Sequence, residues 1–218
     1  MEQKILTENQ KKILSAISED KEIAASFYLS GGTALCAYYI PFRLSEDLDF
    51  FSENEFDSQS IVVFLRKNKK QLQYREFDFQ RSFNRNLFFL YFDKKEILKL
   101  EFTYYPFRQI ETLAKKAGLR VDSLLDIAVN KTFTISQNPR TRDFIDLYFI
   151  INKKGWDFFE LLKKARIKFD WHIDPINLGA QLMKCQDIKE YPNLFKRLDD
   201  KKWQEFYLDI AKRLGEAL

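Results

Sequence analysis

The chain has 218 residues, of which 45% are hydrophobic and 31% are charged, and its net charge is +4. These values are ordinary for a globular protein, and the weak positive charge permits a polyanionic partner without requiring one. No apolar run approaches the ~20 residues that a transmembrane helix needs, so no membrane partner is expected. The N-terminal segment lacks the apolar core of a signal peptide, and two free thiols, Cys36 and Cys185, are favoured over a single disulfide. We therefore expect a cytoplasmic protein.

The predicted elements of the first half alternate between helices and short β-prone segments. Thr7 followed by Gln10 resembles a capping box, which predicts a helix from about residue 8 to 18. A β-prone run at 27–29 ends at Gly31-Gly32, and a helix over 33–39 follows this glycine turn. The later patterns predict a strand at 48–51, a helix over 58–69, and strands near 73–80, 86–92 and 97–104, the last two joined by a polar turn at 93–96.

The second half of the chain carries only helical patterns. Asp122 is a candidate N-cap for a helix that runs to about Ser136. Further helices are predicted near 142–152, 156–168, 174–186 and 201–216. We therefore expect an α+β fold, in which a mixed sheet with flanking helices is followed by a C-terminal helical portion. We assign residues 1–115 to an α+β lobe and residues 116–218 to a helical lobe.

Two aspartates lie inside the apolar segment RLSEDLDFF at residues 43–51. Side chains alternate between the faces of a strand, so Asp47 and Asp49 share one face while apolar neighbours anchor the other in the core. Two adjacent carboxylates repel each other and are costly to desolvate unless a cation meets them. An exposed edge strand is an alternative, because charges on an edge discourage aggregation. A calcium loop does not fit, since Ser52 stands where such a loop requires glycine.

A third carboxylate and the glycine turn fit the same chemistry. If the last predicted strand pairs beside the aspartate strand, Glu101 joins Asp47 and Asp49 on one surface, and three carboxylates suit Mg²⁺. Gly31-Gly32 between a strand and a helix lets backbone N–H groups approach a phosphate closely. Each feature alone is more often a solvated residue or an ordinary turn. Their occurrence in one order favours a site for phosphoryl or nucleotidyl transfer.

The motifs SGGTAL, RLSEDLDFF and LKLEF, in this order, resemble the nucleotidyltransferase superfamily. With Lys131 and the helix RDFIDLYF at 142–149, they are similar to the AbiEii/AbiGii toxin family of nucleotidyltransferases over roughly residues 25–152. The resemblance implies a nucleotidyltransferase-fold mixed sheet and Mg²⁺-dependent transfer of a nucleoside monophosphate from an NTP to an acceptor hydroxyl. It also implies tRNA or another RNA as the acceptor. A type IV antitoxin encoded nearby, which need not touch this protein, is the implied partner.

The resemblance also assigns roles to individual residues. Glu101 is a candidate base for the acceptor hydroxyl, and Lys131 matches a family lysine that contacts nucleotide phosphates. Asp143 and Asp146 share a helix face, and one of them, which the sequence does not distinguish, matches a family aspartate. The helical lobe would complete the active site. The expected ligands of two Mg²⁺ ions are Asp47, Asp49 and Glu101; the expected catalytic set adds Lys131, Asp143 and Asp146; the expected nucleotide-binding set is Gly31, Gly32, Thr33, Arg43, Ser45 and Lys131.

One position departs from the family pattern, because Phe42 stands where a histidine commonly precedes the arginine. This departure leaves open a catalytically silent nucleotide-binding protein of the same fold. A small-molecule acceptor such as an aminoglycoside is a second alternative. Transfer of the terminal phosphate would use the same carboxylates. A zinc site is not expected, since His172 is the only histidine.

Overall fold

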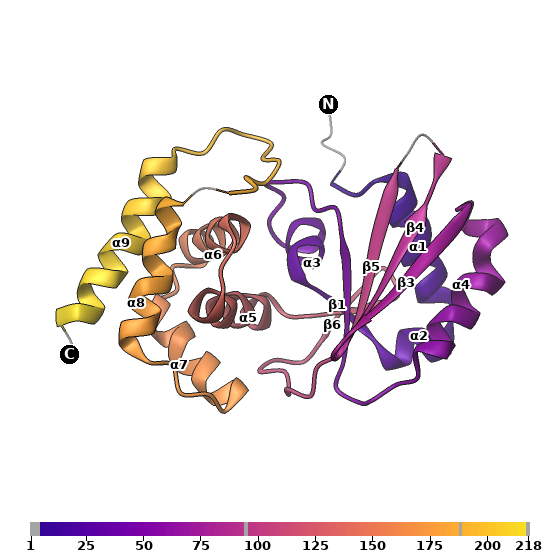
Figure 1. Cartoon of the computed structure of the whole chain (residues 1–218), viewed down its shortest axis with the longest axis horizontal. Coiled ribbons are helices and arrows are strands. Elements are labelled where there is room, and N and C mark those ends of the chain that lie inside the picture. The colour runs from indigo at the N-terminus through magenta and orange to yellow at the C-terminus, as the bar shows by residue number, and fades with distance from the viewer. Residues whose placement is uncertain (1–4, 94–95, 188, 217–218) are drawn as a thin grey trace. The chain divides into compact units, whose positions relative to one another are not determined.

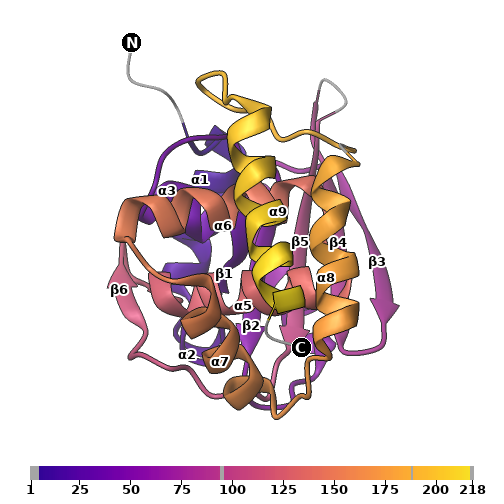
Figure 2. The same ribbon diagram turned by 90° about the vertical axis from the view of Figure 1, so that its left-hand side faces the viewer.

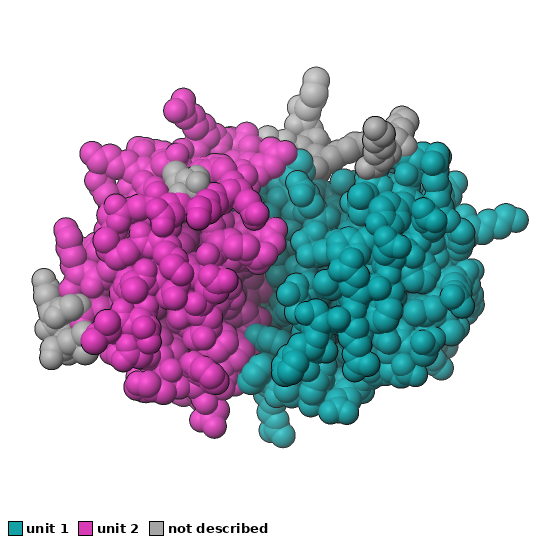
Figure 3. Space-filling view, in the orientation of Figure 1, with its two compact units in different colours: residues 1–123 teal, residues 124–218 magenta. Residues whose placement is uncertain are grey.

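The computed structural model describes residues 5–93, 96–187 and 189–216. The chain divides into two compact units, unit 1 from Met1 to Ser123 and unit 2 from Leu124 to Leu218 (Figure 3). The sequence placed this division after residue 115. The structure places it later because a short strand that ends at Val121 still pairs within the sheet of unit 1.

Unit 1 contains a mixed seven-stranded sheet in the order β3-β4-β5-β2-β1-β7-β6 (Figure 1). Strand β2 pairs parallel with β5 on one side and antiparallel with β1 on the other. β4 forms antiparallel pairs with β3 and β5, and β7 runs parallel to β1. The strands are β1 (Tyr28–Ser30), β2 (Leu48–Ser52), β3 (Glu76–Ser82), β4 (Arg85–Tyr91), β5 (Ile97–Tyr104), β6 (Ala114–Lys116) and β7 (Leu119–Val121).

Helices lie on both faces of this sheet. Figure 1 shows α1 (Glu8–Glu19), α2 (Lys21–Ser26) and α4 (Ser58–Leu72) on one face and α3 (Gly31–Tyr38) on the other. The capping box at the start of α1 is present: Thr7 Oγ1 accepts from Gln10 N at 3.1 Å, and Gln10 Oε1 accepts from Thr7 N at 2.9 Å. This reciprocal pair satisfies two N–H groups that a helix start leaves unpaired.

Aromatic side chains form the centre of the unit 1 core. Phe50 on β2 stacks on Phe102 of β5 with ring centroids 5.0 Å apart, and Phe88 of β4 meets Phe102 edge-on. All three rings are almost fully buried. Burying large rings is strongly favourable, so the face of β2 that carries Phe50 is fixed toward the core. The opposite face, with Asp49, is thereby fixed away from it.

Unit 2 is built mainly from helices joined by loops. Its elements are α5 (Leu124–Gln137), α6 (Thr141–Lys154), α7 (Phe158–Phe169), α8 (Pro175–Met183), the 3-10 helix η2 (Lys184–Gln186) and α9 (Asp200–Glu216). α9 packs against α6 and α8 (Figure 2). Tyr207 of α9 is fully buried and donates its hydroxyl hydrogen to the carbonyl of Phe144 at 2.7 Å. In the described part of the chain, no helix is both long and apolar enough to cross a membrane.

Some local expectations were wrong. No sequence pattern predicted α2, β6 or β7, which have six, three and three residues. α3 begins at Gly31 rather than at Thr33, so the glycines form its first turn. Asp122 lies beside β1, where its carboxylate accepts from the Ser30 hydroxyl at 2.7 Å. The predicted turn at 93–96 includes residues 94 and 95, which lie outside the described residues.

Candidate active site

The three predicted carboxylates, Asp47, Asp49 and Glu101, lie together on the sheet face opposite the aromatic core. Asp49 of β2 stands directly beside Glu101 of β5 in the parallel ladder, and on its other side faces Ser30 of β1. Asp47 precedes β2, two residues from Asp49, and its side chain is 22% exposed. The structure therefore brings the three predicted carboxylates onto one face, as strand alternation requires.

Two cations lie among these carboxylates. Lys99 Nζ is 2.7 Å from Asp47 Oδ2 and 3.8 Å from Glu101 Oε2. Arg85 donates from Nε to Glu101 Oε1 at 2.6 Å and from Nη2 to Oε2 at 2.7 Å. A third donor, the Thr103 hydroxyl, reaches Glu101 Oε1 at 3.0 Å. Both oxygens of Glu101 are thus engaged by neighbouring side chains.

These contacts set the protonation of Glu101. Burial by itself would raise the pKa of this carboxyl group, because a low-dielectric environment disfavours the charged form. The hydrogen bond and positive charge of Arg85, with smaller contributions from Lys99 and Thr103, outweigh burial and hold the pKa of Glu101 below its ordinary value. A lowered pKa makes the Glu101 carboxylate a weaker proton acceptor, which disfavours a role as a general base, for which a pKa near 7 is best.

The glycine turn at the start of α3 lies against the aspartate strand. Gly31 has a φ of +69°, and a Cβ on it would stand 2.5 Å from Asp49 Oδ2. A Cβ on Gly32 would collide with the guanidinium of Arg43 and lie 3.0 Å from Ser45 Oγ. Both positions require glycine, the first for its backbone conformation and both for the close approach of a polar side chain.

Three further residues of the predicted set surround this turn. Arg43 is 3% exposed and donates to the carbonyl of Leu44 at 2.7 Å. The Thr33 hydroxyl donates to the carbonyl of Asp47, which ties α3 to the residue before β2. Ser45 anchors the same loop from the other side, since its carbonyl accepts from Gln10 Nε2 at 2.7 Å. The predicted residues of unit 1 are therefore one connected constellation.

The residues present fit Mg²⁺ in part. Asp49 on β2 and Asp47 just before it offer hard carboxylate oxygens, the kind of ligand that this ion prefers. Glu101 fits less well because Arg85 and Thr103 already occupy its oxygens. Among residues 5–93, 96–187 and 189–216, no group of three or more His, Cys, Asp or Glu side chains is arranged to hold a metal ion. The three-carboxylate metal site stays a prediction, and Asp47 Oδ2 is itself paired with Lys99 Nζ at 2.7 Å.

Unit 2 brings together the other predicted residues. Lys131 of α5 places Nζ 2.6 Å from Asp143 Oδ1 and 2.8 Å from Asp146 Oδ2, both on α6. The two carboxylates are at most 1% exposed, whereas the Lys131 side chain is 11% exposed. The sequence left open which aspartate belongs to the motif, and the structure pairs both with the lysine.

Charge again overrides burial in this cluster. Burial by itself would raise the pKa of Asp143, but the charges of Lys131 and Arg140 and their hydrogen bonds hold that pKa well below its ordinary range. The backbone N–H of Arg140 also donates to Asp143 Oδ2 at 3.1 Å, at the start of α6. Asp143 is therefore an anion that fixes the Lys131 ammonium and the first turn of α6 together.

Comparison with known proteins decides the family. The family model of the AbiEii nucleotidyl transferase toxin, of type IV toxin–antitoxin systems, matches residues 12–217. This chain belongs to the AbiEii family. It is therefore a nucleotidyltransferase, and the match extends well beyond the residues 25–152 that carry the sequence motifs.

Proteins similar to this AbiEii chain occur in Aquifex aeolicus and Helicobacter pylori. The uncharacterized protein aq_aa25 of Aquifex aeolicus is 34% identical over 173 residues, which cover 77% of this chain and 78% of that protein. A Helicobacter pylori protein assigned as a nucleotidyltransferase has a similar structure, with a TM-score of 0.62, 20% identity and coverage of 98% of this chain and 97% of its own. JHP933 from H. pylori gives a TM-score of 0.61, 19% identity and coverage of 98% and 94%. These two structures show the shared fold.

Sequence reasoning missed the two cations of the acidic face. Lys99 had a detectable signal, because it stands two residues before Glu101 and so shares its strand face. No local sequence signal predicted Arg85, because its position beside Thr103 depends on the register of β4 against β5. Phe42, at the family's histidine position, is buried, and the Arg43 guanidinium carbon lies 5.9 Å from its ring centroid.

Proposed function

We propose that this AbiEii protein transfers a nucleoside monophosphate from an NTP to a hydroxyl group of RNA, with Mg²⁺ bound by Asp47 and Asp49. One observation carries the proposal: an oxygen of Asp49 lies against Gly31, at the N-terminus of α3. A carboxylate next to a helix N-terminus allows a metal ion and the phosphates that it neutralises to be held side by side.

The triphosphate would bind at the first turn of α3. Ser30, the N-cap residue, forms no side-chain cap with this helix, because its hydroxyl donates to Asp122 instead. The first N–H groups of a helix have no partners within the helix and favour negative charge. Gly31, Gly32 and Thr33 supply these groups, and the absence of side chains on the glycines lets a phosphate approach closely.

Asp47 and Asp49 are the proposed metal ligands. Bound Mg²⁺ would neutralise charge on the phosphates and lower the pKa of an attacking hydroxyl. Glu101 is assigned to a different task, which is to orient Arg85 through two hydrogen bonds. A guanidinium held in this way suits contact with phosphate oxygens, for which arginine geometry is well matched.

In unit 2, Lys131 is the proposed contact for nucleotide phosphates. Its ammonium group is fixed by Asp143 and Asp146, so its position is set before any substrate binds. Preorganised cations stabilise developing negative charge without reorganising during the reaction. Asp143 and Asp146 are then positioning residues.

Membership of the AbiEii family supports a proposal for the acceptor and the cellular setting. A type IV toxin–antitoxin protein acts on a cellular target, and we propose an RNA such as tRNA as that target, in the cytoplasm. The antitoxin encoded with it need not bind this chain. Arg85 and Lys99 beside the carboxylates support a polyanionic acceptor rather than a cationic aminoglycoside, because they lower the negative charge of the face.

Transfer of label from the NTP tests this proposal. The protein is incubated with total RNA, Mg²⁺ and each NTP in turn, labelled at either the α- or the γ-phosphate. We expect RNA to acquire the α-label and pyrophosphate to be released. Acquisition of the γ-label would show phosphoryl transfer instead, and labelling of small molecules but not RNA would contradict the proposed acceptor.

A further inference from the structure

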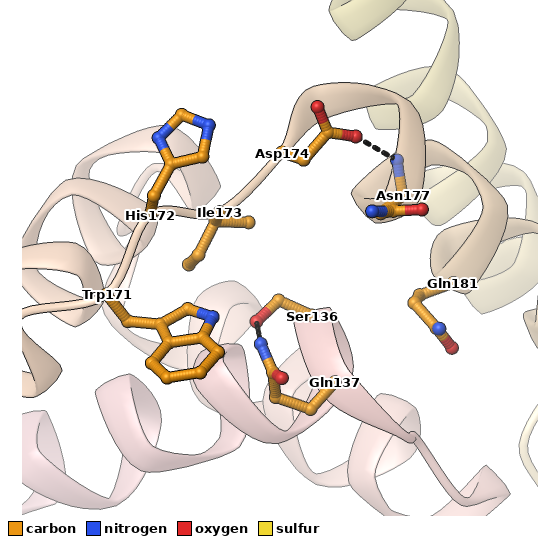
Figure 4. A pocket seen from close by; sticks show the side chains of 8 residues that line it. All are labelled: Ser136, Gln137, Trp171, His172, Ile173, Asp174, Asn177 and Gln181. Carbon is orange, nitrogen blue, oxygen red and sulfur yellow. Dashed lines mark hydrogen bonds between the residues drawn. The ribbon is translucent and has the colours of Figure 1, made fainter.

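We propose that a hollow in unit 2, between the end of α5 and the start of α8, binds an unpaired nucleobase of the RNA acceptor. This inference rests on the proposed function, because it names how that acceptor is recognised. The hollow has a volume of about 560 Å³, within the range of about 300–1,000 Å³ that is usual for small-ligand sites. Its lining is Ser136, Gln137, Trp171, His172, Ile173, Asp174, Asn177 and Gln181 (Figure 4).

The hollow offers a flat aromatic surface. Trp171 is 54% exposed, which is unusual for so large an apolar ring, and Figure 4 shows its indole at the edge of the hollow. The preceding residue, Asp170, ends α7 in the left-handed conformation with φ of +44°, and the Trp171 N–H donates to the carbonyl of Arg166 at 3.2 Å. The backbone at Trp171 is therefore fixed. Single-stranded nucleic acids are commonly held by stacking bases on such rings.

Amide side chains line the hollow both beside the indole and across from it (Figure 4). Gln137 comes from the end of α5, and Asn177 and Gln181 stand one turn apart on α8 (Figure 4). Among the described residues, the side-chain oxygen of Gln181 is buried and has no hydrogen-bond partner. An unsatisfied buried acceptor costs about 1–3 kcal/mol, so rotation of the Gln181 amide toward a hydrogen-bond donor of a bound ligand is favoured. Amides that donate and accept are suited to the edge of a base.

A second hollow adjoins the first and carries positive charge. Trp171 and His172 line both hollows, and the second, of about 740 Å³, is also lined by Lys163 and Arg166 of α7. Neither cation forms an ion pair with a residue that the structure describes, although Asp170 lies at the same hollow. A base stacked on Trp171 would thus have a binding region for its flanking phosphates in the adjoining hollow.

The chemistry of the pair of hollows favours RNA over a protein partner. Exposed Ile167 and Ile176 lie near Trp171 in sequence, so an apolar protein contact would use the same surface. An apolar contact would leave the Gln181 acceptor unsatisfied, and it would not pair with the cations Lys163 and Arg166. An unpaired nucleotide satisfies all three features, the ring, the amides and the cations.

Binding of a labelled single-stranded RNA 12-mer to the full chain tests the inference. Stacking of one base contributes about 1–3 kcal/mol, so Trp171→Ala is expected to raise the Kd about 5- to 160-fold. Trp171→Phe, which keeps a ring, is expected to recover most of the affinity, and Gln181→Leu to lose part of it. Lys163→Glu with Arg166→Glu should weaken binding and reduce its salt dependence. Ile176→Ala and the charge control Lys201→Glu with Lys202→Glu should bind like the wild type.

The same variants separate failure of this inference from failure of the proposed function. In label transfer, Trp171→Ala should raise the KM for RNA while kcat and the KM for the NTP stay unchanged. The inference would be overturned if folded Trp171→Ala and Gln181→Leu bound single-stranded RNA with wild-type affinity. It would also be overturned if the variants lost affinity equally for duplex and single-stranded RNA, or if the wild type did not bind the RNA. Single-stranded RNA binding that depends on Trp171, without any label transfer, would support the inference and contradict the proposed function instead.

Discussion

Arg85 holds both carboxylate oxygens of Glu101, with Nε 2.6 Å from Oε1 and Nη2 2.7 Å from Oε2. This fork joins β4 to β5 beside Asp49, on the face where a metal ion and a triphosphate are proposed to bind. A carboxylate that is fully engaged by a guanidinium is a poor metal ligand but a good positioning group. The Arg85–Glu101 pair therefore assigns Glu101 to positioning, whereas the sequence analysis expected Asp47, Asp49 and Glu101 all to bind metal.

The two roles predict different responses to Mg²⁺. Asp49→Asn should raise the Mg²⁺ concentration for half-maximal transfer by more than about 10-fold, since even outer-shell changes at metal sites cost 10- to 100-fold. Glu101→Gln should lower kcat while the Mg²⁺ dependence stays near that of the wild type. Titrations of transfer rate against Mg²⁺ measure both values. An equal shift in the two variants would make Glu101 a metal ligand after all.

The glycine turn gives a second prediction. Gly31→Ala places a methyl group 2.5 Å from Asp49 Oδ2 and forces a non-glycine residue to a φ of +69°. The left-handed conformation alone costs about 1–2 kcal/mol, and Asp49 must also move. We expect a loss of stability of at least this size and loss of transfer activity, measured by urea unfolding and label transfer. Gly155→Ala is the matched control, because Gly155 has a φ of +67° but a Cβ on it would meet no atom within 4 Å. This variant should lose stability and keep its transfer activity.

A buried ion pair in unit 2 gives a third prediction. Lys168 Nζ lies 2.7 Å from Asp126 Oδ1, and the side chains are 2% and 0% exposed. Lys168→Met leaves the Asp126 carboxylate without this cation, and removing one partner of a buried pair costs about 3–5 kcal/mol. The double variant Lys168→Met with Asp126→Leu should recover most of the lost stability. The chain's three tryptophans all lie in unit 2, so their fluorescence follows its unfolding in urea.

The low pKa of Asp143 predicts acid sensitivity of unit 2. A carboxyl group whose pKa is lower in the folded state adds stability above its unfolded pKa of about 3.9, and this stability is lost as the pH falls toward the folded value. The free energy of unfolding should therefore decline below about pH 5. Asp143→Asn should be less stable at pH 7 and show a flatter decline on acidification. Exposed Asp209→Asn serves as the control, and a decline as steep in Asp143→Asn as in the wild type would argue against the assignment.

Local sequence signals predicted most of the fold where they were strong. The Thr7–Gln10 capping box and the alternation around Asp49 correspond to the observed start of α1 and the observed faces of β2. The start of α3 was placed too late because glycine has a low helix propensity, and only the contact of Gly31 with Asp49 reveals why it begins the helix. β6 and β7 are too short to carry a periodic pattern.

The sequence predicted which residues of the candidate site lie near one another but not the ion pairs that they form. Strand alternation gave the shared face of Asp47, Asp49 and Glu101, and the family motif gave Lys131. The pairing of Arg85 with Glu101 requires the register of a hairpin, and the pairing of Lys131 with both Asp143 and Asp146 requires the packing of α5 on α6. Neither is encoded in a local pattern, since both depend on residues brought together from different elements.

The most direct test of the account is single-turnover transfer of an α-phosphate label to RNA by the wild type, Asp49→Asn and Glu53→Gln. The last variant removes an exposed acidic charge just beyond the far end of β2 and is the control for charge alone. The account predicts transfer by the wild type and Glu53→Gln, and a loss of more than about 100-fold in Asp49→Asn, because a direct ligand contributes more than the outer-shell groups at metal sites. Undiminished transfer by folded Asp49→Asn would contradict it.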